Sequence, residues 1–238
     1  HCGRCTSVCP ANQTGKVLDP RAVIVHIHER TMDRAPLLLK QQAGEELTPD
    51  EQAVVEKKLV GDYVSPDALW ACTTCGACME ECPVNIEHVP AIIGMRRNMV
   101  MMESQFNEES SLMPDIYGNM ETNSVPWGGF AHDDRANWAE GMGVKTLSED
   151  QNMEVLFWVG CAGSYDDRAK QITKAFAELM QIAGVEFRIL GTEENCTGDV
   201  ARRTGNEYLA DMLTKTNIET FNRYDVKKIV TTCPHCFN

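Results

Sequence analysis

The sequence has no long hydrophobic run and is short of basic residues. No apolar stretch approaches the roughly 20 residues that a membrane-spanning helix needs. Lysine and arginine together number 22 against 35 acidic residues, so the formal net charge is −13. This balance argues against a nucleic-acid-binding protein, because binding to phosphates requires basic surface. An acidic surface suits a basic protein partner, although it is more commonly a means to solubility.

Cysteine, in contrast, is abundant. The 238 residues include eleven cysteines, of which only Cys161 and Cys196 stand outside a C-x2-C or C-x3-C spacing. A cysteine-rich chain can be a disulfide scaffold, but this chain is long enough to build hydrophobic cores without disulfides. Thiolates that hold a metal instead indicate the cytosol or another reducing compartment.

One run of cysteines is especially informative. Cys72, Cys75, Cys78 and Cys82 are followed directly by Pro83. This C-x2-C-x2-C-x3-C-P spacing is typical of bacterial [4Fe–4S] ferredoxins. Zinc is the alternative, but zinc sites generally use two pairs of ligands rather than three closely spaced cysteines and a fourth before proline. The run therefore predicts an iron–sulfur cluster.

The last part of the same run occurs at the start of the chain, as Cys2, Cys5, Cys9 and Pro10. The missing first cysteine would fall just before His1. The chain does not begin with methionine, and it ends inside a further Cys-Pro-His-Cys motif. We therefore expect an internal segment of a longer polypeptide.

Two such runs predict two clusters with crossed ligation, because the fourth cysteine of each run serves the other cluster in two-cluster ferredoxins. One predicted ligand group contains Cys2, Cys5 and Cys82 with the missing cysteine, and the other contains Cys9, Cys72, Cys75 and Cys78.

Residues 1–102 otherwise favour helices. Asp19-Pro20 and Thr48-Pro49-Asp50-Glu51 are helix-start signals, and the second helix is expected to extend to Gly61. The 62 residues between the two runs are too many for a compact β-type ferredoxin. They fit an α-helical ferredoxin domain in which the spacer forms a helical hairpin.

Residues 103–152 are expected to connect two domains. Positions 103–150 hold ten acidic and two basic residues together with several prolines and glycines. Trp127 and Trp138 argue against a free linker, because disordered segments are poor in aromatic residues. We expect the segment to be ordered with both indoles buried.

Residues 153–238 have a β-α-β-α-β pattern, with strands near 154–159, 185–190 and 228–231 and helices up to Gly184 and from Val200 to Tyr224. This order predicts a parallel sheet. The loop that begins at Gly160 has neither the dinucleotide nor the P-loop fingerprint.

The remaining cysteines follow strand ends or precede helices, where open α/β sheets build their sites. They are separated by 34, 36 and two residues, and one sheet could bring all four together to hold a third cluster: Cys161, Cys196, Cys233 and Cys236.

This pattern resembles the cysteine-rich CCG domain of heterodisulfide reductase subunits and of the iron–sulfur subunits of glycolate, lactate and anaerobic glycerol-3-phosphate dehydrogenases. A helical two-cluster ferredoxin domain followed by a CCG domain is similar to these subunits over nearly the whole chain. The stretches 69–72, 83–88 and 194–199 are most similar to the electron-transfer-flavoprotein:quinone oxidoreductases, a membrane-associated branch.

The resemblance implies a fold of class α + α/β, with a ferredoxin-type domain at 1–102, an acidic connection at 103–152 and a CCG-type domain at 153–238. It implies an oxidoreductase subunit that relays electrons through two [4Fe–4S] clusters and a third in the CCG domain. The expected donor is an electron-transfer flavoprotein or FAD dehydrogenase, and the expected acceptor is a quinone, a membrane subunit or a downstream cluster, at the cytoplasmic face of the membrane.

One departure from the family pattern bears on the chemistry. The CCG motif has two adjacent cysteines, and here Thr197 replaces the second. In heterodisulfide reductases the paired cysteines help to hold a cluster that cleaves a disulfide, so an ordinary relay cluster fits this sequence better. The alternatives are a thiol–disulfide reductase and a soluble ferredoxin-like carrier. The sequence contains no acid–base or nucleophile constellation that would indicate another catalytic site.

Overall fold

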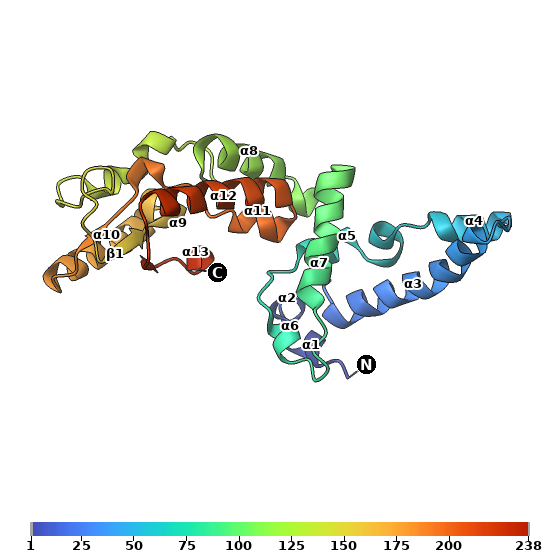
Figure 1. Cartoon of the computed structure of the whole chain (residues 1–238). Helices are drawn as coiled ribbons and strands as arrows, with labels where there is room; N and C mark the ends of the chain where they lie inside the picture. Colours follow the sequence, from blue (N-terminus) through green and yellow to red (C-terminus); the bar gives the residue numbers. More distant parts are fainter. Residues whose placement is uncertain (1, 238) are drawn as a thin grey trace. The chain divides into compact units, whose positions relative to one another are not determined.

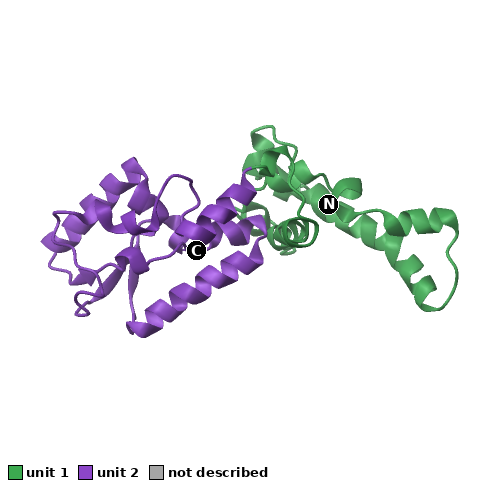
Figure 2. Cartoon of the chain, turned by 90° about the horizontal axis from the view of Figure 1, so that it is seen from above, with its two compact units in different colours: residues 1–111 green, residues 112–238 purple. Residues whose placement is uncertain are grey.

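A computed structural model describes residues 2–237, and Figure 1 labels their helices and strands. The chain forms two compact units that divide between Ser111 and Leu112 (Figure 2). Within residues 2–237, no helix combines the length and apolar character needed to cross a membrane.

The first unit consists of helices and turns, and its part within residues 2–111 contains no β-strand. Its elements are α1 (Arg4–Ser7), α2 (Pro10–Gln13), α3 (Pro20–Gln42), α4 (Pro49–Glu56), the π-helical turn η1 (Leu59–Tyr63), α5 (Pro66–Trp70), α6 (Ala77–Glu80), α7 (His88–Arg97), the π-helical turn η2 (Asn98–Glu103) and η3 (Glu108–Ser110).

The predicted start signals begin the hairpin helices. The Asp19 carboxylate accepts a hydrogen bond from the Ala22 amide at the start of α3, and Thr48 and Glu51 form a reciprocal capping box at α4. The expectation that this second helix reaches Gly61 is wrong, because α4 ends at Glu56 and Gly61 has a φ of 110° that no α-helix accommodates.

The core of the first unit lies beside the cysteines. Leu69 and Ile92 are fully buried, and the same hydrophobic cluster includes Cys9 with Cys72 packed against it. Each fully buried aliphatic side chain contributes about 1.5–3 kcal/mol to folding. The core therefore fixes the backbone from which these two thiols project.

The second unit is an α/β domain whose strands are all parallel. Its elements are α8 (Met113–Asn123), the 3-10 helix η4 (His132–Ala139), β1 (Val155–Trp158), α9 (Gly160–Tyr165), α10 (Asp167–Ile182), β2 (Phe187–Arg188), η5 (Gly191–Glu193), α11 (Asp199–Thr204), α12 (Glu207–Arg223), β3 (Ile229–Thr231) and α13 (Pro234–Phe237). The strand order is β2-β1-β3, as the β-α-β-α-β pattern predicts.

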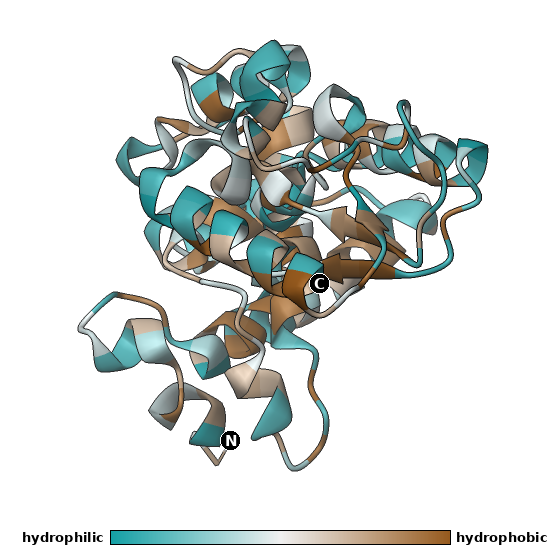
Figure 3. Ribbon diagram, turned by 90° about the vertical axis from the view of Figure 1, so that its left-hand side faces the viewer, coloured by the Kyte–Doolittle hydropathy of each residue, from teal (hydrophilic) through white to brown (hydrophobic). Residues whose placement is uncertain are grey.

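Helices cover both faces of the sheet. Phe157 of β1 packs with residues of α10, whereas Trp158, the next residue, packs against Phe221 of α12. Successive strand residues point to opposite faces, so a continuously apolar strand is needed between two helical layers. Figure 3 shows these strands as hydrophobic.

One of the two expected long helices is interrupted. The helix expected to end at Gly184 forms as α10, and the Asp166 side chain caps its start by accepting from the Ala169 amide. The helix expected from Val200 to Tyr224 is divided at Gly205, whose φ of 98° ends α11 before α12 begins. This break arises from a local backbone signal that lies inside an otherwise helical pattern.

The acidic segment 103–152 is ordered, but only one of its indoles is buried. Trp138 is 3% exposed and meets the Phe157 ring edge-on, whereas Trp127 is 45% exposed. The expectation of burial is thus wrong for Trp127, which lies in the bend that contains Gly128 and Gly129. Residues 112–152 belong to the same compact unit as the sheet.

Candidate metal centres

The two cysteine runs have the same local backbone. Gly3 lies between Cys2 and Cys5, and Gly76 lies between Cys75 and Cys78. Both glycines have a left-handed φ, near 80°, and each is followed by a one-turn helix, α1 or α6, that carries the next cysteine. A left-handed backbone conformation at this point favours glycine. The two cysteine runs therefore form the same kind of turn.

One cavity is lined by cysteines from both runs. Cys9 of the first run shares it with Cys72, Cys75 and Cys78 of the second. Burial and then the neighbouring Cys72 thiol raise the pKa of Cys78 to about 11, because several thiolates in one buried place repel one another. This is the grouping that crossed ligation requires.

A second cavity, of about 540 Å³, contains the reciprocal group. It is lined by Cys2 and Cys5 together with Cys82. The Ile86 amide donates to the Cys82 sulfur at 3.3 Å. Amides at Ile86 and then Val84 lower the pKa of Cys82, so the backbone favours its thiolate form.

The donors around these cavities fit iron–sulfur clusters. His88 lines the second cavity, and its Nδ1 atom is buried with no hydrogen-bond partner among the described residues. A bound group with sulfur acceptors would satisfy such an atom. No three His, Cys, Asp or Glu side chains within residues 2–237 are placed to hold a single metal ion.

Arg96 holds the second run against the core. Its guanidinium is 3% exposed, lies over the Trp70 ring and donates to the carbonyl oxygens of Leu69 and Cys72. Charge-assisted hydrogen bonds to carbonyl groups fix the chain where it enters the first cysteine of the run. No sequence pattern had indicated this residue.

In the second unit, the predicted cysteines lie at one edge of the sheet. Cys161 begins the helix after β1, Cys233 follows β3, and Cys196 lies in the loop after η5. These are the carboxyl ends of parallel strands, where α/β sheets place their sites.

The thiols are close enough to interact in pairs. A hydrogen bond from Cys196 lowers the pKa of Cys161 to about 7, and a hydrogen bond from Cys236 lowers the pKa of Cys233 to about 6. The two pairs also approach each other. A Cβ atom on Gly160, which has a φ of 77°, would come within 2.8 Å of the Cys236 sulfur.

Two further residues complete this site, and sequence analysis missed both. Arg135 of η4 donates to the Cys161 sulfur at 3.5 Å and pairs with Glu194 at 3.1 Å. Glu194 also accepts from the amides of Val159 and Gly160, at 2.9 and 2.8 Å. Arg135 is one of only two basic residues in 103–150. This scarcity of basic residues was the only sequence feature that could have drawn attention to Arg135.

Thr197 stands beside the site with its backbone tightly constrained. A Cβ atom on the neighbouring Gly198 would lie 3.1 Å from backbone atoms of Ala210 in α12. Thr197, Cys236 and Trp158 all line a cavity of about 280 Å³. The glycine of the motif therefore allows the cysteine loop to approach α12.

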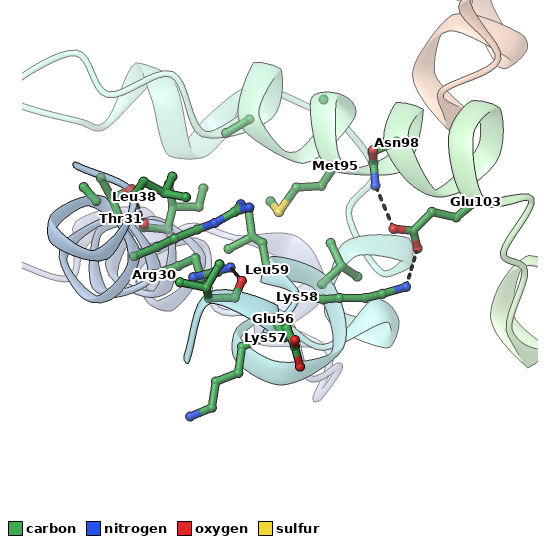
Figure 4. Close-up of a pocket in the computed structure, with 17 residues that line it drawn as sticks. Arg30, Thr31, Leu38, Glu56, Lys57, Lys58, Leu59, Met95, Asn98 and Glu103 are labelled. Carbon is green, nitrogen blue, oxygen red and sulfur yellow. Dashed lines mark hydrogen bonds and ion pairs between the residues drawn. The ribbon is translucent and has the colours of Figure 1, made fainter. Parts of the chain in front are cut away.

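One large cavity has no cysteine in its lining. Figure 4 shows this pocket of about 710 Å³ between α3, the end of α4 and α7. Two of the residues that line this pocket, Lys58 and Asn98, donate hydrogen bonds to the carboxylate of a third, Glu103. It results from the hairpin spacer and does not belong to the metal centres.

Family models match both parts of the chain. A 4Fe-4S dicluster domain model matches residues 1–86, and the CCG cysteine-rich domain model matches residues 155–238. No solved structure matches.

Relatives with both parts align over nearly the whole chain. An EtfAB:quinone oxidoreductase of Syntrophomonas wolfei is 44% identical over 98% of this chain and 34% of its own length. A probable iron-sulfur-binding oxidoreductase FadF of Bacillus subtilis is 37% identical over 100% of this chain and 37% of its own. One component of the dihydromethanophenazine:CoB–CoM heterodisulfide reductase of Methanosarcina barkeri is 27% identical over 99% of this chain and 54% of its own. The chain thus spans about a third of the length of the first two relatives.

Proposed function

We propose that this chain is the electron-relay part of an oxidoreductase, because it matches the models of a 4Fe-4S dicluster domain and a CCG cysteine-rich domain one after the other. The observation that carries the proposal is the sorting of the cysteines into three groups, two in the first unit and one in the second.

The proposed ligands are the eleven cysteines in these groups. A [4Fe–4S] cluster, when bound, supplies one-electron transfer. In the first unit, the amides near Cys82 lower the pKa of its thiol, and Arg96 fixes the chain at Cys72. In the second, Gly160 allows Cys236 to approach Cys161. These residues position the ligands, which is one way in which a protein tunes such a site.

The proposed donor is a flavoprotein, and the proposed acceptor is a quinone. The support is similarity to a relative named EtfAB:quinone oxidoreductase. A relative from Chromohalobacter salexigens, 34% identical over the whole of this chain and 35% of its own length, is named a probable membrane-anchored ferredoxin, which supports association with a membrane. The negative charge of −13 suits a basic docking face on the donor.

Disulfide reduction is the second candidate, because the heterodisulfide reductase components are also similar. Thr197 argues against it at this site. A threonine hydroxyl is a much weaker metal ligand and nucleophile than a thiolate, so Thr197 does not replace the second cysteine of the pair.

The test is rapid-mixing kinetics with the complete, anaerobically purified protein, a reduced flavoprotein and a short-chain quinone. Cys196→Ser is expected to abolish quinone reduction and one cluster signal while the ferredoxin-type clusters are still reduced. Thr197→Ala, the matched control, should leave both nearly unchanged.

Two outcomes would overturn the relay. One is loss of the third cluster in Thr197→Ala. The other is reduction of a disulfide substrate by the wild-type protein with loss of that activity in Thr197→Ala.

A further inference from the structure

The buried ion pair beside Cys161 has a role that ligation alone does not explain. Arg135 and Glu194 are 1% and 2% exposed in their side chains. Burying an ion pair carries a desolvation penalty that only well-placed partners offset. Such a pair would add little to a site that merely needed four cysteines, so its position indicates a functional role.

Both side chains of the ion pair make further hydrogen bonds to their surroundings. The Arg135 guanidinium donates to Glu194, to the Ser124 carbonyl oxygen at 3.1 Å and to the Cys161 sulfur at 3.5 Å. Glu194 accepts two backbone amides from the turn that starts at Val159. The guanidinium is therefore fixed in position and orientation, with one N–H directed to the sulfur.

The two charges are not equivalent toward Cys161. Arg135 contacts the sulfur directly, whereas Glu194 is engaged by Arg135 and by the two amides of the turn. Arginine stays protonated in proteins, so its positive charge persists in both redox states of the site. Reduction by one electron adds one negative charge to the cluster and its thiolates, and a fixed cation with an N–H···S bond stabilises that added charge more than the oxidised state.

We propose that Arg135 is a positioning residue that raises the reduction potential of the CCG-type cluster site through Cys161, and that Glu194 holds it in place and moderates its effect. This inference rests on the proposed function, since it needs a cluster on Cys161. A raised potential favours the second unit as the destination of an electron that the flavoprotein delivers to the first.

Arg188 provides a matched control. It is also a buried arginine of the second unit, 7% exposed, and it pairs with Asp150 at 2.8 Å. Its hydrogen bonds go to carboxylates and a backbone carbonyl rather than to a cysteine. Arg188→Gln therefore removes a buried guanidinium from the same unit without touching the cysteines.

The experiment is a potentiometric titration of the complete holoprotein followed by electron paramagnetic resonance. Arg135→Gln is expected to lower the equilibrium constant for reduction of the third cluster at least tenfold, which is about 59 mV for one electron. Glu194→Gln, which leaves Arg135 without its counter-charge, should raise the same constant. Arg188→Gln should change it less than twofold, and the ferredoxin-type signals should not move in any variant.

Opposite shifts from the two members of one ion pair are not expected from a purely structural role. Equal shifts in Arg135→Gln and Arg188→Gln, or shifts of the same sign in Arg135→Gln and Glu194→Gln, would overturn the inference. If neither variant assembles the cluster, pulsed resonance of the wild-type protein labelled with ¹⁵N-arginine decides. A hyperfine coupling to the third cluster supports the contact, and its absence overturns it. A wild-type protein without any third signal would instead overturn the proposed function.

Discussion

Single glycines determine whether the third group of cysteines can assemble. Gly160→Ala should abolish the third cluster signal, because the new methyl group would lie 2.8 Å from the Cys236 sulfur. Gly184→Ala is the control: its φ is also positive, 70°, but a Cβ there meets nothing within 4 Å. In both variants alanine must adopt a left-handed backbone conformation, which costs roughly 1–2 kcal/mol.

Iron analysis and low-temperature resonance of both variants make the comparison. We expect loss of about four irons, one cubane, from Gly160→Ala only. A normal third signal in Gly160→Ala would show that Cys236 does not need this approach.

The sequence alone shows the spacing of the candidate cysteine ligands, but it does not show the residues that contact them. Cysteine spacing is local information, and it led directly to the groups that contain Cys9 and Cys82. Arg135 reaches Cys161 from 26 residues away, and Glu194 reaches Arg135 from 59. Such contacts exist only after the sheet has formed, so no local pattern encodes them.

Among the elements, η4 packs against the sheet through the Trp138 indole. Trp138→Ala should lower the free energy of unfolding of the second unit by about 3–5 kcal/mol, as expected when a buried aromatic residue is truncated. Trp127→Ala should change it by about 0.5 kcal/mol or less, because that indole is 45% exposed.

Denaturant-dependent hydrogen exchange of the α10 amides measures both effects. This helix shares the hydrophobic cluster that contains Trp138. Equal effects of the two substitutions would show that η4 is not anchored through Trp138.

Helix starts were predicted better than helix ends. Asp19 and Thr48 cap their helices through side chains that the sequence displays. The break at Gly205 falls inside an apolar pattern that continues on both sides, so periodicity alone does not reveal it. The prediction that Trp127 is buried was wrong for a similar reason. Composition indicates that a segment is ordered, but it does not indicate which aromatic ring reaches a core.

At the scale of the whole molecule, the two units differ in what stabilises them. The second has two hydrophobic clusters, one on each face of its sheet. In the first, the short helices α1 and α6 carry cysteines and pack on each other, so their order should depend on bound metal.

Anaerobic iron removal with a chelator tests this difference. Hydrogen exchange should accelerate sharply in residues 2–13 and 72–86, while α10 and α12 keep their protection. The control is the same treatment of iron-loaded protein without chelator. Equal protection of residues 72–86 with and without iron would contradict a metal-dependent first unit.

The order of the two domains could be predicted from the sequence. The expected boundaries at 102 and 152 followed composition, whereas the compact units divide between Ser111 and Leu112. Residues 113–123 and 132–139 form α8 and η4, and the partners that order them, such as Phe157 for Trp138, come later in the chain.

The central claim is that the chain relays electrons through clusters with crossed cysteine ligation, and single serine substitutions test it most directly. Low-temperature electron paramagnetic resonance of the complete reduced protein would record which cluster signal each variant alters. Cys9→Ser should alter the same signal as Cys75→Ser, and Cys82→Ser the same signal as Cys5→Ser. If Cys9→Ser and Cys5→Ser alter one signal while Cys75→Ser and Cys82→Ser alter the other, the ligation is not crossed and the account is contradicted.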